Sequence, residues 1–170
     1  YLEPLLEEGV RYFGVGGALG FDTLVAEKLL ALRESQPKIR IILVQPFSGY
    51  QSRWTPAQQA RAAAVEARVD KVVVCCQTPG REAFLARDRH LVDGSSCCIA
   101  WCTRATGGTA YTLRYAQRQG LRVWNVAQIG ERLGYTHPSS FIRMFHKVEG
   151  ITPAQYREEH SPSQAGPDKH

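Results

Sequence analysis

A glycine-rich stretch near the start of the chain has the composition of an anion-binding turn. The residues expected to contact a ligand are Gly16, Gly17, Ala18, Gly20 and Asp22. Glycine has no Cβ atom, so backbone N–H groups can approach a phosphate, and a helix that follows presents its positive end. The spacing is not the full GxGxxG pattern. A tight turn from a strand into a helix, without any ligand, is the alternative interpretation.

A second stretch of the same kind lies at residues 106–110. It contains the pair Gly107 and Gly108, followed by Thr109, and the hydroxyls of Thr106 and Thr109 would add hydrogen-bond donors. Two such turns at one edge of a parallel sheet would form a common anion cradle. Their joint presence therefore favours ligand binding over two purely structural turns.

Charged side chains between these turns offer further ligand contacts. Arginine makes forked contacts with phosphate or carboxylate, which makes Arg87 and Arg89 candidates. The alternative is an exposed helical face on which these arginines pair with Asp88. Asp22 could bind a ribose hydroxyl or cap its helix, and we expect Glu27 to face solvent or to pair locally. Their five-residue spacing does not favour an acid/base pair.

The elements that would position these residues follow from the apolar pattern. Predicted strands cover residues 12–15, 39–44, 71–76, 97–102 and 121–126, and predicted helices cover 21–33, 56–68, 82–92 and 109–119. Strands that are apolar along their whole length and alternate with helices are typical of a parallel sheet covered on both faces. Right-handed crossovers then bring every strand-to-helix turn to the same edge. The sequence predicts an α/β fold, a Rossmann-like doubly wound parallel sheet of about five strands.

Composition limits the class of protein. A chain of 170 residues with 44% hydrophobic residues can bury one α/β core and carry a small appendage. Residues 1–127 hold 16 basic and 11 acidic side chains and the remainder holds 5 of each, so the net charge of +5 lies in the α/β part and favours anionic ligands. The 5 cysteines lack repeated CxxC spacing, which indicates buried free thiols and no metal site. Without a signal peptide or a membrane-length apolar run, we expect a cytoplasmic protein.

Three stretches, in this order, resemble motifs of the YpsA-like branch of the SLOG superfamily. The branch motif GxALGxDxxxAE is matched from Gly17 to Glu27, an RNRxMVDxSS-like motif from Arg87 to Ser96, and GGTAxTxxYA from Gly107 to Ala116. Gln45-Pro46-Phe47 and Arg53-Trp54 fall where the branch has a proline after its second strand and a Lys/Arg-Trp pair. The resemblance extends from about Gly14 to Val126.

The resemblance implies a Rossmann-like domain that binds or senses a nucleotide-derived ligand such as ADP-ribose or NAD. The related LOG phosphoribohydrolases cleave nucleoside monophosphates with an arginine and the glutamate of PGGxGTxxE. Here Thr106 replaces the proline and Leu113 occupies the glutamate position, so we expect no catalytic residue of this type. The branch also implies a strand with a TGHR-like loop before Tyr1, so we expect residues 1–127 to be an N-terminally incomplete domain.

The region after residue 127 has a different character. Residues 129–157 resemble the second helix-turn-helix of AraC-type regulators, and their apolar spacing suits a small helical core around a turn at Gly134. The resemblance implies that the helix from about Pro138 enters a major groove. The candidate DNA contacts are Ser139, Ser140, Arg143, His146 and Lys147. The alternative is a helical cap on the α/β domain.

These interpretations give three regions and three functional hypotheses. We expect the α/β domain at 1–127, the partial helix-turn-helix at 128–160 and a disordered tail at 161–170. The leading hypothesis is non-catalytic binding of a nucleotide-type small molecule, linked to transcription. An AraC-type DNA-binding regulator and a LOG-like phosphoribohydrolase are the alternatives. DNA is a candidate partner of the C-terminal segment, and the sequence leaves an oligomer open.

Overall fold

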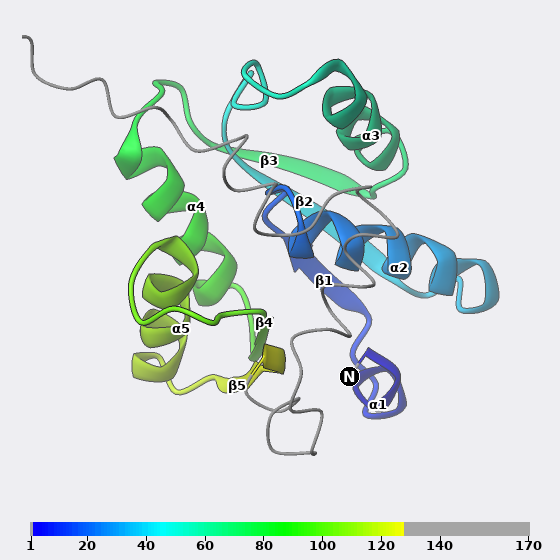
Figure 1. Cartoon of the computed structure of the whole chain (residues 1–170). Coiled ribbons are helices and arrows are strands. Elements are labelled where there is room, and N and C mark those ends of the chain that lie inside the picture. The colour runs from blue at the N-terminus through cyan, green and yellow to red at the C-terminus, as the bar shows by residue number, and fades with distance from the viewer. Residues whose placement is uncertain (1, 128–170) are drawn as a thin grey trace, which may run out of the picture. The chain divides into compact units, whose positions relative to one another are not determined.

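A computed structural model of the chain describes residues 2–127. All five expected strands and all four expected helices are present, and one further helix precedes them (Figure 1). The elements in chain order are α1 (Leu2–Glu7), β1 (Tyr12–Val15), α2 (Phe21–Ser35), β2 (Arg40–Phe47), α3 (Pro56–Glu66), β3 (Lys71–Cys76), α4 (Arg81–Asp93), β4 (Cys97–Ala100), α5 (Gly108–Arg118) and β5 (Arg122–Asn125). The expected helical appendage, its candidate DNA contacts Ser139, Ser140, Arg143, His146 and Lys147, and the expected tail lie outside the described residues.

The strands are parallel but form two hydrogen-bonded groups. One sheet has the order β1-β2-β3, with Val15 opposite Leu43 and Leu43 opposite Val72. The other pairs β4 with β5, and Ala100 lies opposite Asn125. The parallel α/β architecture was therefore predicted correctly. The single continuous sheet was not found, because β1 and β4 share no hydrogen-bonded ladder within residues 2–127.

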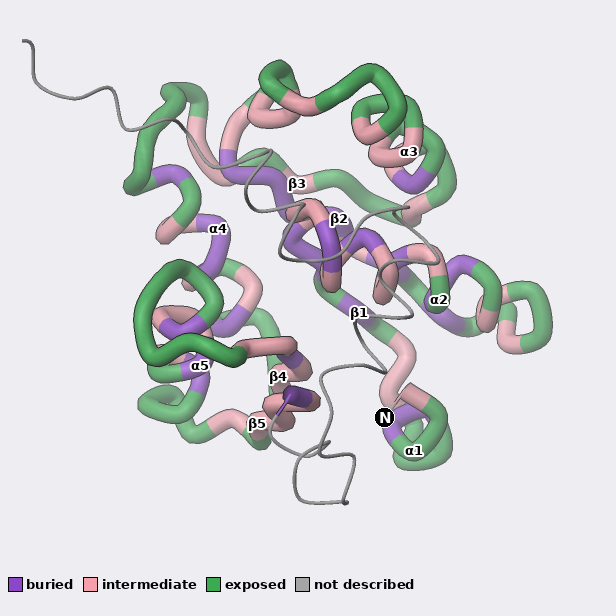
Figure 2. The backbone as a smooth tube through the Cα atoms, in the orientation of Figure 1, coloured by how far each residue is buried: buried purple, intermediate pink, exposed green. Residues whose placement is uncertain are grey.

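The two faces of β1 and β2 pack against different helices. Phe13, Ile41 and Leu43 join Leu29 and Leu30 of α2 in one buried apolar cluster. On the opposite face, a Cβ atom added at Gly14 would come within 2.9 Å of Leu91 Cδ2 in α4. Since successive strand residues point to opposite faces, this alternation gives a sheet with helices on both sides, and Figure 2 shows the burial concentrated along β2.

The helices that follow β1, β3 and β4 begin differently from the helix that follows β2. Helix α3 begins with a capping box, in which Thr55 and Gln58 exchange side-chain-to-backbone hydrogen bonds around Pro56. Helices α2, α4 and α5 follow Gly20, Gly80 and Gly107, none of which has a capping side chain. Three helices at the carboxyl edge of the strands therefore have glycine as their N-cap residue.

Candidate functional site

The first glycine turn joins β1 to α2 and is stabilised by hydrogen bonds among neighbouring residues. Gly17 has φ +64° and Gly20 has φ +88°, values in the left-handed region that favours glycine. Asp22 Oδ2 accepts a hydrogen bond from the Ala18 N–H at 3.2 Å, and Thr23 Oγ1 donates one to the Ala18 carbonyl at 2.9 Å. The helix N-cap is Gly20, so the capping role considered for Asp22 is wrong. Its carboxylate stabilises the turn.

Arg87 of α4, which is distant in sequence, also binds this turn. Its guanidinium donates to Asp88 Oδ1 at 2.8 Å and to the Gly16 carbonyl oxygen. A Cβ atom at Gly16 would lie 2.5 Å from Arg87 Nη1 and 2.8 Å from Asp22 Oδ2. Arg87 and Asp88 are both buried, at 9% and 8% exposure, so the expected alternative of an exposed charged face is wrong for this pair. Gly16 is small because the guanidinium occupies the space beside it.

Tyr50, which follows β2, fills the space beside Gly17. Its hydroxyl donates to the Gly17 carbonyl at 2.9 Å. A Cβ atom at Gly17 would lie 2.5 Å from Tyr50 Oη and 2.8 Å from Leu43 Cδ1. The sequence-based search missed Tyr50, and its position in the loop after the second strand was the only available signal.

The charges around this turn are unequal. Two carboxyl groups, those of Asp22 and Asp88, surround one guanidinium, that of Arg87. Burial raises the pKa of the Asp22 carboxyl above its ordinary value, and the charge of Arg87 lowers it by a smaller amount. The cluster is therefore a buried polar network that fixes the turn.

The second glycine turn, between β4 and α5, is anchored at its base and open at its tip. Asn125 makes two hydrogen bonds to the backbone of Cys102, at 3.0 and 2.7 Å, and Arg114 Nη1 donates to the Ala105 carbonyl at 2.7 Å. A Cβ atom added at Gly107 or Gly108 would meet nothing within 4 Å. Residues 103–109 are exposed. The tip, including Thr109, is thus accessible in front of the α5 N-terminus.

Helix α4 contacts both regions. Arg87 reaches the first turn, while Arg89 Nη1 donates to the Tyr111 hydroxyl of α5 at 3.3 Å and Arg89 Nη2 lies 3.9 Å from Glu82. The structure brings Gly16, Gly17, Ala18, Asp22 and Arg87 into one cluster. Gly107, Gly108 and Thr109 belong to the other turn, and Arg89 lies at the contact between α4 and α5. A common cradle made by both turns stays a prediction.

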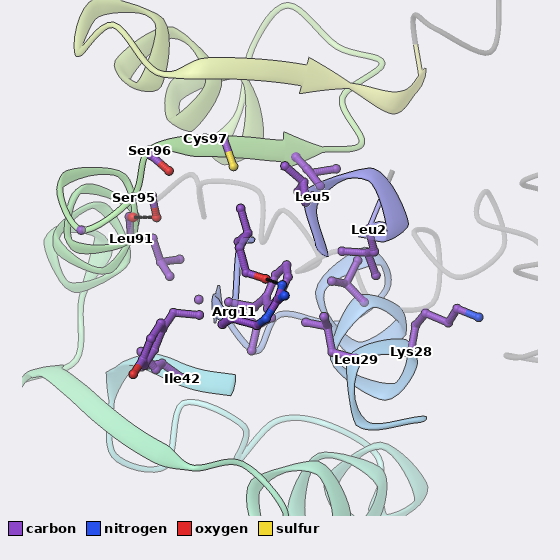
Figure 3. A pocket seen from close by; sticks show the side chains of 18 of the residues that line it. Leu2, Leu5, Arg11, Lys28, Leu29, Ile42, Leu91, Ser95, Ser96 and Cys97 are labelled. Atoms are coloured by element: carbon purple, nitrogen blue, oxygen red, sulfur yellow. Dashed lines mark hydrogen bonds between the residues drawn. The ribbon is translucent and has the colours of Figure 1, made fainter. Parts of the chain in front are cut away.

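A cavity of about 760 Å³ lies between the two strand groups (Figure 3). Its walls combine residues of β1 and β4 with apolar side chains of α1 and α2, such as Leu5 and Leu29, and Leu91 of α4. Arg11 reaches it but donates to the carbonyls of Leu6 and Val10 at 2.6 and 2.8 Å. Residues 16–20 and 106–109 are absent from this lining. This cavity therefore marks the break between the two strand groups rather than the glycine turns.

Two positions bear on the hydrolase alternative. Leu113, at the position of the LOG glutamate, is buried in α5. Glu27 makes a forked ion pair with Arg61 of α3, with contacts of 2.7 and 2.8 Å. It therefore pairs with another helix, where we had expected solvent or a local partner.

The cysteines are free and only partly buried, where full burial had been expected. Burial raises the pKa of the Cys98 thiol to about 11, which disfavours a reactive thiolate. No cluster of three or more His, Cys, Asp or Glu side chains suited to a metal ion occurs in the described part of the chain. None of the helices in that part has the length and hydropathy required to cross a bilayer.

The models of two protein families match parts of this chain. Residues 1–128 match the model of the YpsA SLOG family, and residues 103–159 match the model of a helix-turn-helix domain. These matches confirm both resemblances seen in the sequence. They also combine, in one chain, a SLOG domain and a domain type that binds DNA.

Several similar curated proteins carry the name UPF0398 protein. The one from Shouchella clausii is 30% identical over 52% of this chain and 48% of its own length. Those from Halalkalibacterium halodurans and Bacillus velezensis are 25% and 29% identical, over 68% and 69% of this chain and 62% and 66% of their own lengths. The chain therefore spans less than two thirds of the length of each of these relatives.

Proposed function

We propose, from the premise that the chain belongs to the YpsA SLOG family, that its α/β domain binds a nucleotide-derived anion without hydrolysing it. The observation that supports this most is the open turn at the start of α5. Gly107 and Gly108 leave free space there, and the exposed backbone precedes a helix N-terminus, where N–H groups attract phosphate.

The two turns have different parts in this proposal. The open turn supplies N–H groups and the hydroxyls of Thr106 and Thr109 to a phosphate. The packed turn, fixed by Arg87 and Tyr50, supplies a rigid wall whose backbone does not reorganise on binding. ADP-ribose and NAD, which carry two phosphates between ribose groups, are the ligands to test first.

A thermal unfolding assay of the full chain tests the proposal. A ligand at a hundred times its Kd stabilises the folded state by about 2.7 kcal/mol, so ADP-ribose or NAD should raise Tm by several degrees. Gly108→Glu places a carboxylate at the open turn, where an added Cβ atom meets nothing within 4 Å, and at a helix end where acidic residues are favourable. This variant should keep its own Tm and lose the ligand-induced shift.

Gln117→Glu is the matched control, because it adds the same charge to an exposed position near the other end of α5. It should retain the shift. If neither compound raises the Tm of the wild-type chain, or if both variants respond alike, ligand binding at this turn is wrong.

A second proposed function, DNA binding, is favoured by the helix-turn-helix match at residues 103–159. The segment after residue 127 has no net charge, so affinity must come from specific contacts rather than from general attraction. Arg143→Ala should weaken salt-dependent binding to a selected duplex. If the affinity for the duplex is unchanged in Arg143→Ala, Arg143 does not contact the DNA.

Together, ligand binding and DNA binding make a ligand-linked transcription factor that works in the cytoplasm.

The hydrolase alternative is tested by a separate assay of AMP cleavage. Incubation with AMP should release no free adenine, because Leu113 stands at the glutamate position and Glu27 is paired with Arg61. Release of adenine that disappears in Glu27→Ala would establish the hydrolase instead.

A further inference from the structure

Four aromatic rings form a continuous row at the carboxyl edge of the strands. Phe47 ends β2, Tyr50 and Trp54 lie in the loop that follows, and Phe84 lies in the first turn of α4. Neighbouring rings meet edge to face: Phe84 with Phe47 at 5.6 Å, Phe47 with Tyr50 at 6.4 Å, and Tyr50 with Trp54 at 5.5 Å between centroids. Such contacts fix the orientation of each ring.

The row is accessible to a ligand. Phe84 is 40% exposed and is one of four exposed large hydrophobic residues among residues 2–127. The other three rings are partly buried. An exposed aromatic ring held in place by its neighbours is a surface on which another planar ring can stack.

The row also touches the packed glycine turn that follows β1. The Tyr50 hydroxyl donates to the Gly17 carbonyl, so one member of the row touches the turn that follows β1. Two exposed arginines flank the row: Arg53 precedes Trp54, and Arg81 lies three residues before Phe84, on the same side of α4. A ligand on these rings would therefore meet positive charge that suits a phosphate.

We propose that Phe84, supported by Phe47, is the stacking subsite for the base of a nucleotide. This inference rests on the proposed function and deepens it, because it names which part of the ligand is selected. Phosphate contacts at the turns do not distinguish a nucleotide from a base-free sugar phosphate. A ring on the aromatic row makes that distinction, since stacking on an aromatic side chain gives roughly a tenfold gain in affinity or more.

Isothermal titration calorimetry of the full chain with three probes tests the subsite. AMP has base and phosphate, ribose 5-phosphate has only the phosphate, and adenosine has only the base. The wild-type chain should bind AMP about tenfold more tightly than ribose 5-phosphate. Phe84→Leu, which keeps apolar bulk but removes the ring, should abolish this preference and leave ribose 5-phosphate binding unchanged. Phe84→Trp should retain the preference.

Tyr12→Leu is the matched control. It removes an aromatic ring that is 72% exposed and begins β1, at the opposite edge of the strands. It should leave the AMP preference intact. A thermal melt of each variant checks folding, and the exposure of both rings makes large losses of stability unexpected.

The outcomes separate this inference from the proposed function. Equal binding of AMP and ribose 5-phosphate, or a preference that survives Phe84→Leu, would overturn the stacking subsite while anion binding stands. Binding of adenosine as tight as that of AMP, still lost in Phe84→Leu, would overturn the anion site while the subsite stands. Binding of none of the three probes would overturn both.

Discussion

The two glycine turns of the domain have similar sequences and opposite surroundings. Each leads from the end of a parallel strand into a helix, and each contains an adjacent pair of glycines. At Gly16 and Gly17 an added Cβ atom would meet Arg87, Asp22, Tyr50 or Leu43 at 2.5 to 2.8 Å. At Gly107 and Gly108 it would meet nothing within 4 Å. The first turn is filled by the protein itself, and the second is open.

This difference shows what a glycine pair can and cannot indicate. Absence of a Cβ atom signals that something approaches the backbone closely, but it does not say what. At the first turn the close neighbours are a guanidinium and a phenol from distant parts of the chain. At the second turn the space is free, and a ligand is one occupant that would use it. The predictions below test this contrast between a packed and an open turn.

The largest effect is expected for Arg87→Met. The substitution leaves the Asp88 carboxylate and the Gly16 carbonyl without their donor in a buried site, which should cost about 3–5 kcal/mol of unfolding free energy. Urea denaturation measures this loss. The neighbouring Arg89→Met removes an arginine whose ion pair is exposed to solvent, and it should reduce stability far less. Equal losses in the two variants would mean that Arg87 does not hold the turn.

Gly17→Ala should have the next largest effect. It forces a side chain into a left-handed conformation at φ +64° and against Tyr50 and Leu43, for a loss of about 1–3 kcal/mol. If the Tyr50 hydroxyl obstructs the new methyl group, adding Tyr50→Phe should restore part of the lost stability. The double variant should then lose less stability than the sum of the two single variants in a double-mutant cycle. Strict additivity would contradict the packing described here.

The elements of the fold were largely predictable, because they depend on local pattern. The continuous apolar runs at β2 and β3 and the helical period of α2 and α4 are properties of neighbouring residues. The ends of the elements were less predictable, since β4 ends at Ala100, two residues before the predicted limit. The division of the strands into two groups could not be predicted, since pairing between strands is set by tertiary structure rather than by the sequence of each strand.

Some of the candidate residues lie together as expected from the sequence, but their contacts could not be predicted. Gly16, Gly17 and Arg87 were all identified as site residues, and the structure joins them. The hydrogen bond from Arg87 to Gly16 spans 71 residues and the bond from Tyr50 to Gly17 spans 33, so no local motif reveals either. Arg87 was considered a phosphate contact because arginine suits that role. Its burial and its internal partners follow only from the packing of α4 on β1 and β2.

Asp22→Asn should change how stability depends on pH. Burial raises the pKa of Asp22 in the folded state above its ordinary value of 3.8, so the folded state binds this proton more tightly than the unfolded state. The stabilising effect of protonation is complete below the unfolded pKa and is lost as pH rises through the folded pKa. Asparagine does not titrate, so the variant should gain stability relative to the wild type as pH rises from about 4.

Urea unfolding of both proteins at several pH values measures this difference. A variant that loses stability relative to the wild type over the same range would show that ionised Asp22 is favoured in the folded state. The turn would then be held by an ion pair with Arg87 rather than by a desolvated carboxyl.

The smallest effect on stability is expected for Gly108→Ala, the counterpart of Gly17→Ala at the open turn. Gly108 is the first residue of α5, its φ is not positive, and the new methyl group meets no atom within 4 Å. Alanine is favoured over glycine in a helix by about 0.5–1 kcal/mol, so the variant should be as stable as the wild type or slightly more stable. The same methyl group would stand where a phosphate must approach the N–H groups, so affinity for ADP-ribose should fall while Tm without ligand does not. A loss of stability like that of Gly17→Ala would show that the second turn is packed too, and the contrast between the turns would be wrong.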